Sequence, residues 1–347
     1  RLLNTVLPPG WLPLGAAGLA DAAVLPALLG TLGFGLIGTA SLWRAYRTTI
    51  KLYTGQFATG ERRTTTAAEM AAEAAADADP TRVRFLERRL PWVSEHASAV
   101  ALAGFRSILR APEAKMSLIA PLIMVVVFGG VAASGAGTPP AALRPLIAFG
   151  TAAGVLLIAG AQLIGNQFGY DRAGFRAYVL SPVPRREILL GKNLAVAPLA
   201  VGMGTVLLLI AGIVYPMRID HYPAALAQLL SAYLVFCVLA NGLSILAPMP
   251  MKAGTLQAAE VKLVPVVLQM VFLMILPLVL VPVLLPYGLE ILLDQLDVVH
   301  GLPISLVLSL GVLALVVFLY GKLLTAEGAW LSAREQKILE VVTSKAE

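Results

Sequence analysis

The sequence predicts an all-α integral membrane protein, a polytopic helical bundle of about seven transmembrane helices: one leading helix and a six-helix unit. Three observations predict this fold class. Hydrophobic residues make up 58% of the 347 residues and charged residues only 13%, whereas soluble domains carry about 25% charged residues. Several apolar runs approach or exceed the roughly 20 residues that cross a bilayer as a helix. The lysines and arginines cluster beside these runs, as is typical of membrane segments.

The leading part, residues 1–54, contains the first predicted transmembrane helix, from about Val24 to Trp43. Arg44, Arg47 and Lys51 follow it directly. Because cytoplasmic loops carry the excess of Lys and Arg, this end is predicted to be cytoplasmic. The chain then starts outside the membrane, and it shows no signal-peptide pattern, so we expect further helices upstream.

Residues 55–96 are predicted to be a cytoplasmic linker. They contain an alanine-rich acidic segment with helical character. This helix should stop at Asp79-Pro80, because the residue before a proline is driven out of the helical region. The polarity of the segment separates the leading helix from the third predicted domain, residues 97–347.

That domain begins with a predicted amphipathic connecting helix over residues 97–111. Phe105 lies on its apolar face, and Arg106 and Arg110 lie on or near the polar face. Such a helix is expected to lie on the membrane surface and to contact lipid.

Six further apolar runs predict the transmembrane helices of this domain. The first begins near Met116, and the other five cover about 146–165, 194–214, 225–246, 264–285 and 304–320. The connections alternate between basic and near-neutral or acidic, which predicts a multi-pass protein with a cytoplasmic C-terminus. The net charge of +6 is therefore attributed to orientation and anionic lipid rather than to nucleic acid.

The most polar connection, residues 166–193, combines aromatic residues, arginines and turn formers. Aromatic residues and arginine are the types that dominate protein interfaces, so this loop is predicted to bind a cytoplasmic partner, the alternative being a loop anchored at the membrane surface. The residues singled out are Phe168, Gly169, Tyr170, Asp171, Arg172, Phe175, Arg176, Arg185 and Arg186.

The sequence offers no catalytic residues and no metal ligands of recognisable spacing. It lacks the Gly-rich G-x-x-x-x-G-K-[ST] phosphate loop, so we expect no ATP hydrolysis and no cofactor in this chain. The three histidines lie in different loops, and the single cysteine, Cys237, lies in an apolar run. Because charged residues are almost absent from the middle of the runs, a proton-driven carrier is disfavoured.

Some polar and soft residues do occur within the apolar runs. They either form hydrogen bonds between helices or line a substrate path. The candidates are Gln162, Asn166, Gln228, Asn241, Gln269, Met270 and Met274. A path of this composition suits a hydrophobic or amphipathic molecule.

The layout and the loop resemble the permease subunits of type-2 ATP-binding-cassette exporters of the bacterial inner membrane. The resemblance is carried by Arg110-Ala111-Pro112-Glu113 after the amphipathic helix, by the string Phe168–Phe175, by Leu180–Arg186 and by Leu190–Asn193. It implies that a separate ATPase subunit binds ATP and Mg, that it grips loop 166–193, and that a second permease unit (a homodimer or a fused half) completes the path. A secondary carrier or channel, or a membrane scaffold without transport, remains the alternative.

Overall fold

The computed structural model describes residues 8–53, 89–111, 119, 123, 139–156, 160–252, 258–259, 262–297 and 301–343. These residues are almost entirely helical. The described ranges contain no strand, only an isolated antiparallel bridge between Met251 and Ala258. The all-α prediction is therefore confirmed for the described residues. The chain divides into two compact units, Arg1–Arg82 and Val83–Glu347.

The first unit is a helical hairpin of α2 (Pro8–Ala20) and α3 (Val24–Tyr53). Ala22 makes the turn between them with a φ of 58°. The ring of Trp11 packs edge-on against Phe34, with 5.8 Å between the ring centroids. Gly33 allows this approach, because a Cβ there would lie 2.3 Å from the Trp11 ring. The predicted leading helix is therefore present, and it is longer than the apolar run alone.

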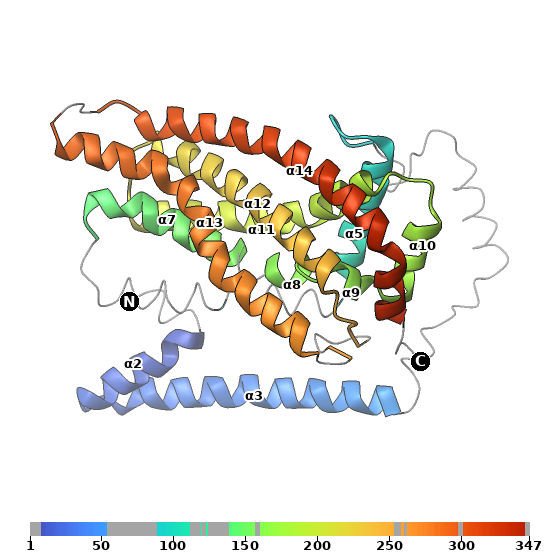
Figure 1. Cartoon of the computed structure of the whole chain (residues 1–347). Helices are drawn as coiled ribbons and strands as arrows, with labels where there is room; N and C mark the ends of the chain where they lie inside the picture. The colour runs from blue at the N-terminus through green and yellow to red at the C-terminus, as the bar shows by residue number, and fades with distance from the viewer. Residues whose placement is uncertain are drawn as a thin grey trace, which may run out of the picture. The chain divides into compact units, whose positions relative to one another are not determined.

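The second unit, which we call the main unit, is built on four long helices that alternate in direction. They are α11 (Arg185–Val214), α12 (His221–Leu246), α13 (Leu263–Gln295) and α14 (Ile304–Thr343). Figure 1 shows α12 and α14 running side by side. We call the end of this bundle that carries residues 166–193 the loop end, and the end that carries residues 215–220 the far end.

Shorter helices complete the main unit. Helix α5 (Glu95–Arg110) packs on α11 at the loop end, and α7 (Arg144–Val155) packs on α11 and α12. Gly191 of α11 permits the first contact, because a Cβ at this position would lie 2.6 Å from Cβ of Val100. In Figure 1, α5 crosses the direction of α12 and α14.

Helix α12 is the centre of the core. In its most apolar window 61% of the residues are buried, against 33%, 17% and 11% in α11, α13 and α14. Phe236, Cys237 and Ala240 of α12 are fully buried and pack with Leu156 and Leu276. The three other long helices therefore expose broad apolar surfaces, and the lipid of a bilayer is the environment that such surfaces suit.

Among the described residues, five helices are long and apolar enough to cross a membrane: α3, over Val24–Ile50, and the four long helices of the main unit. The count of seven stays a prediction. The run that starts near Met116 lies mostly outside the described residues, and so does most of the linker at 55–96. The run at 146–165 contains most of α7 and the short helix α8 (Ala161–Leu163), with the π-helical residues Leu156 and Gly160 between them and residues 157–159 outside the described part.

Two boundaries differ from the predicted ones at the loop end. Helix α11 begins at Arg185 rather than near Leu194, and α14 continues to Thr343 rather than ending near Tyr320. In both cases the added turns contain charged residues. A prediction from hydropathy alone therefore ends these helices too early. The helices continue because the apolar side chains of the added turns, including Leu189 and Leu331, are buried at the loop end.

Candidate functional site

The connection at residues 166–193 is an ordered set of short helices. It contains α9 (Gln167–Asp171), the 3₁₀ turn η4 (Arg172–Gly174), α10 (Phe175–Leu180) and the first turns of α11. Arg172 has a φ of 51°, in the left-handed region, and makes the corner between α9 and the following turn. The predicted loop is thus folded into a compact cap on the loop end of the bundle.

Two aromatic residues predicted to meet a partner anchor this cap to its own chain. Phe168 and Phe175 are 0% and 1% exposed, and their rings meet edge to face with 5.1 Å between centroids. They share a buried cluster with Leu331 and Ile338 of α14. A partner has no access to these two rings, so their role is to hold α9 and α10 against α14.

An ion pair between Asp171 and Lys192 joins the end of α9 to α11. Nζ of Lys192 lies 2.7 Å from Oδ1 of Asp171 and 5.1 Å from the centroid of the Tyr178 ring. Burial raises the pKa of Asp171, and the ammonium of Lys192 opposes this shift. The carboxylate is therefore desolvated by the fold and stabilised by one cation.

Two arginines of the predicted site form contacts within the chain. Arg172 donates from Nε to the carbonyl of Met251, at 3.0 Å, and from Nη2 to that of Lys252, at 2.8 Å. Arg185 pairs with Glu335 of α14 at 2.6 Å and also donates to three backbone carbonyls of residues 179–183. These arginines fix the cap to the α12–α13 connection and to α14.

Gly169 lies where the backbone of α9 comes closest to the chain that follows α12. A Cβ at this position would be 2.0 Å from the carbonyl oxygen of Met249. The Asn166 side chain lies beside the same point, 2.4 Å from such a Cβ, and its amide donates to the Met249 carbonyl and accepts from the Met249 amide, both at 2.8 Å. A glycine is required here so that the backbone of α9 can meet the end of α12.

The exposed face of the cap consists of other residues. Arg176 is exposed, Leu180 is 78% exposed, and the Arg186 side chain is 46% exposed. Pro182 and Pro184 are exposed between them. Of the residues predicted for partner contact, Arg176 and Arg186 lie on this face, whereas Tyr170 is half-buried.

Three of the predicted path residues form hydrogen bonds inside the main unit. Besides Asn166, the buried Gln228 donates to Ser309 of α14 at 3.1 Å. Asn241 accepts from Gln167 and donates to Glu327, both at 2.9 Å. These bonds join α12 to α9 and α14, which is the interhelical role that polar residues commonly take in membrane bundles.

The other path candidates lie elsewhere. Met270 and Met274 are 61% and 75% exposed on the outer surface of α13, and Gln269 is half-buried. Gln162 belongs to α8, and its side chain lies outside the described part of the structure. The structure therefore does not bring the candidates together around one common space, and the substrate path stays a prediction.

The connecting helix α5 has the amphipathic form that was predicted. Its buried residues, Ala97, Ser98, Ala101 and Leu102, belong to the face toward α11. Phe105 is half-buried, and Arg106 and Arg110 are exposed. The hydroxyl of Ser94 accepts from the amide of Ala97 as an N-cap and also hydrogen-bonds to Glu187 of α11.

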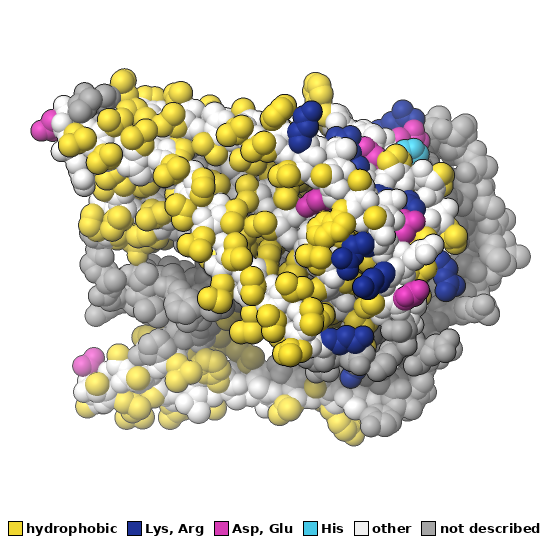
Figure 2. Space-filling model, in the orientation of Figure 1, with side chains coloured by type: hydrophobic (Ala, Val, Ile, Leu, Met, Phe, Trp, Pro, Cys, Tyr) yellow, Lys and Arg dark blue, Asp and Glu magenta, His cyan; other side chains and the backbone are white. Residues whose placement is uncertain are grey.

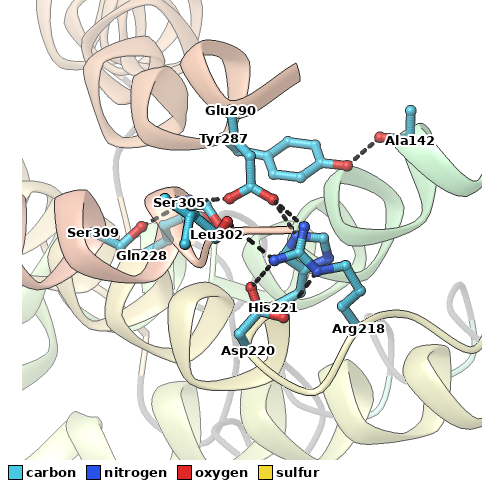
Figure 3. Close-up of polar contacts among 10 residues, drawn as sticks. All are labelled: Ala142, Arg218, Asp220, His221, Gln228, Tyr287, Glu290, Leu302, Ser305 and Ser309. Carbon is cyan, nitrogen blue, oxygen red and sulfur yellow. Dashed lines mark hydrogen bonds and ion pairs between the residues drawn. The ribbon is translucent and has the colours of Figure 1, made fainter. Parts of the chain in front are cut away.

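A second polar group, which we call the far-end cluster, was not predicted (Figure 3). It is made of Arg218, Asp220, His221, Glu290 and Ser305. Glu290 of α13 accepts from Arg218 at 3.0 Å and lies 2.9 Å from Nε2 of His221. Its other oxygen accepts from the backbone amide of Ser305, at 2.6 Å. The residues come from the α11–α12 connection and from the ends of α12, α13 and α14, which are far apart in sequence, so no local pattern reveals them.

The far-end cluster has the donor types of a metal site. Asp220, His221 and Glu290 each bring one ligand atom within 4.8 Å of the others, and these side chains are common ligands of zinc. However, Arg218 already contacts both carboxylates, at 2.8 Å to Asp220 and 3.0 Å to Glu290. A metal ion bound to all three ligands would have to displace this guanidinium, so the cluster as it stands fits an arginine.

Comparisons of this chain with models of protein families, with curated proteins and with solved structures found no match. Function is therefore inferred from the geometry of the cap, of the far-end cluster and of the helices that join them.

Proposed function

We propose that this chain is the transmembrane subunit of an ATP-driven exporter, and that a separate ATP-binding-cassette ATPase docks on the exposed face of the cap. The observation that carries the proposal is that residues 166–193 contain two distinct sets, one buried and holding the cap together and one exposed on its surface. Buried rings and internal ion pairs hold the cap rigid, and this leaves Arg176, Leu180 and Arg186 exposed together with two prolines. An exposed leucine beside arginines on a rigid surface suits a protein partner.

The charge distribution supports a cytoplasmic position for the cap. Among the described Lys and Arg residues of the main unit, Arg144 and Arg218 lie at the far end, and the others belong to the loop end. Figure 2 shows the Lys and Arg side chains of this face gathered near one end of the bundle and the hydrophobic side chains spread over the rest. By the positive-inside rule the loop end is cytoplasmic, as is the C-terminus, in a bacterial inner membrane.

A movement of the cap would be transmitted to the bundle through direct side-chain contacts. The cap is tied to α14 through Arg185 and Glu335, and to the α12–α13 connection through Arg172. Helix α5 rests on the neighbouring turns of α11. An ATPase that binds ATP and Mg and closes on ATP would then shift the long helices through the cap. Because ATP binds the closed ATPase better, it would favour one of two conformations of the permease.

Two further parts of the proposal concern substrate and stoichiometry. The broad apolar surfaces of α13 and α14 suit lipid and a second permease unit, either another copy or a fused half. A hydrophobic or amphipathic substrate fits the scarcity of charge along these helices. The polar residues Asn166, Gln228 and Asn241 then stabilise the bundle beside the substrate path.

The test compares one substitution at the two ends of the bundle. Tagged protein is purified from native membranes, and ATP hydrolysis by the co-purified ATPase is measured. Leu180→Asp and Arg176→Glu should abolish co-purification, because they place negative charge on the docking face. Ile219→Asp is the matched control, since Ile219 is an 87% exposed apolar residue at the far end. The proposal fails if wild type brings down no ATPase, or if Leu180→Asp retains as much as Ile219→Asp.

A secondary carrier is the second candidate, and one observation favours it. Glu327 lies in α14, is 8% exposed and hydrogen-bonds to the neutral amide of Asn241. A buried carboxylate beside the path of a membrane transporter is a common site of proton transfer, and Glu327 follows the apolar run that ends near Tyr320. Uptake into proteoliposomes driven by a pH gradient, without ATPase and abolished by Glu327→Gln, would support the carrier over the exporter.

A further inference from the structure

We infer that the far-end cluster is a latch, in which Glu290 acts as the positioning residue that holds the outer end of α13 against α12 and α14. The closure does not depend on the proposed ATPase, because it is a property of this chain alone. Its use in transport would be to keep the far end shut until the helices move.

One carboxylate, that of Glu290, joins three separate segments at the far end. Glu290 belongs to α13, Arg218 and His221 to the α11–α12 connection and the start of α12, and Ser305 to the first turn of α14. Both oxygens of Glu290 are used, one by Arg218 and His221 and the other by the Ser305 amide. Figure 3 shows the carboxylate between these groups.

Arg218 reinforces the same junction. It donates to both oxygens of Asp220, at 3.1 and 2.8 Å, and to the carbonyl of Leu302, at 3.1 Å. The chain just before α14 is thereby joined to the start of α12 by a second route. The Tyr287 ring packs edge-on against the imidazole of His221, with 5.5 Å between centroids, and its hydroxyl donates to the Ala142 carbonyl.

Helix α13 is less buried than α12, on which it packs. In its most apolar window only 17% of the residues are buried. Its buried residues follow one face, and those near the far end are Val283, Pro286, Tyr287 and Glu290 itself. Pro277, Pro282 and Pro286 interrupt its backbone hydrogen bonding just before Glu290. Prolines are the usual cause of helix kinks, so the outer end of α13 is the part of this helix best able to swing away.

A buried pair of polar residues lies under the far-end cluster. Gln228 of α12 and Ser309 of α14 form a buried hydrogen bond one turn deeper, and Ser309 is 0% exposed. The two residues are covered as long as the far end is closed. Exposure of position 309 therefore reports whether the latch is open.

The test is the rate at which a cysteine at position 309 of the detergent-solubilised protein reacts with a water-soluble maleimide, which has access to both ends of the bundle. Cys237, the only native cysteine, is first replaced by alanine, and Ser309→Cys is introduced. Adding Glu290→Gln should raise the labelling rate about tenfold, because the amide cannot satisfy all the donors that the carboxylate accepts. Arg218→Gln, which leaves the Glu290–Ser305 bond in place, should give a smaller increase.

A second reporter separates the latch from general loosening. Ser244 is 0% exposed at the loop end, where its hydroxyl accepts from the amide of Phe168. Ser244→Cys should be labelled at the same slow rate with or without Glu290→Gln. Glu340→Gln, which removes an exposed carboxylate at the opposite end of α14, should leave both rates unchanged.

Two results would overturn the inference: unchanged labelling of position 309 in both Glu290→Gln and Arg218→Gln, or equal acceleration at positions 309 and 244. Neither result bears on the ATPase, so the latch and the proposed export function stand or fall separately.

Discussion

Lys192 and Asp171 form an ion pair, with 2.7 Å between Nζ and Oδ1, that joins α11 to the end of α9. Their side chains are 12% and 19% exposed. These two charges therefore face the interior of the cap, where they hold α9 against α11, and they are not part of its exposed face. This separation between residues that hold the cap and residues that are exposed on it yields the first prediction.

Removing one partner of this pair should destabilise the protein. Asp171→Asn or Lys192→Met leaves a desolvated charge or amide without its partner, and the loss of a partner in a buried pair costs about 3 kcal/mol. We expect a lower midpoint of thermal unfolding in detergent. The double variant Asp171→Met with Lys192→Met should recover most of the loss, because no charge is left unpaired. Arg176→Gln, on the exposed face, is the control, and a wild-type midpoint in both single variants would contradict the prediction.

A methyl group at Gly191 should push α5 away from α11. A Cβ at this position would lie 2.7 Å from the carbonyl oxygen of Ala97, which is backbone and cannot rotate aside. Overpacking of this kind costs about 1–3 kcal/mol, so Gly191→Ala should lower the unfolding midpoint. Gly202→Ala is matched to it, since Gly202 lies in the same helix with no atom within 4 Å of the added Cβ. If the two variants have equal midpoints, the close approach of α5 is not as described.

The hydrogen bonds among Gln167, Asn241 and Glu327 should depend on an acceptor at position 327 rather than on its charge. Glu327→Gln keeps an oxygen that can accept from the Asn241 amide and should be tolerated. Glu327→Leu leaves that amide buried without a partner, which costs about 1–3 kcal/mol. Thermal unfolding of the two variants decides the matter, and an equal loss of stability in both would show that the charge itself is needed.

Chelation should leave the far-end cluster intact. Because Arg218 pairs with both Asp220 and Glu290, EDTA should not change the unfolding midpoint, whereas Arg218→Met should lower it by leaving the two carboxylates to repel each other. A midpoint that falls with EDTA and is restored by zinc would instead indicate a metal ion at Asp220, His221 and Glu290.

The sequence was sufficient to predict the helices whose ends coincide with a change in hydropathy. Helix α14 starts at Ile304 as predicted, after a proline, and α12 ends at Leu246 as predicted. Where charged residues continue a helix on an amphipathic face, as at Arg185 and beyond Tyr320, hydropathy ends the segment too early. The run at 146–165 contains the π-helical residues Leu156 and Gly160, and hydropathy gives no signal for this change of helix type.

For the site, the sequence located the cap but not the role of each residue in it. Phe168 and Phe175 have the composition of an interface, yet they are buried, because the unpredicted extension of α14 provides a surface for them to pack on. The contacts of Glu290 with Arg218 and His221 join residues about 70 positions apart. Pairings of that range depend on the tertiary fold, which periodicity and spacing do not report.

The length of α14 has a mechanical consequence. Its 40 residues extend about 60 Å at 1.5 Å per residue, twice the roughly 30 Å of a hydrocarbon core, and no proline interrupts it. The helix begins with Ser305 at the far end and reaches Glu335 beside the cap. Figure 1 shows α14 changing direction as it approaches the loop end, yet it stays one uninterrupted helix from Ile304 to Thr343. A shift imposed at Glu335 is therefore passed along a single helix toward Ser305, and the cap and the far-end cluster are connected through α14.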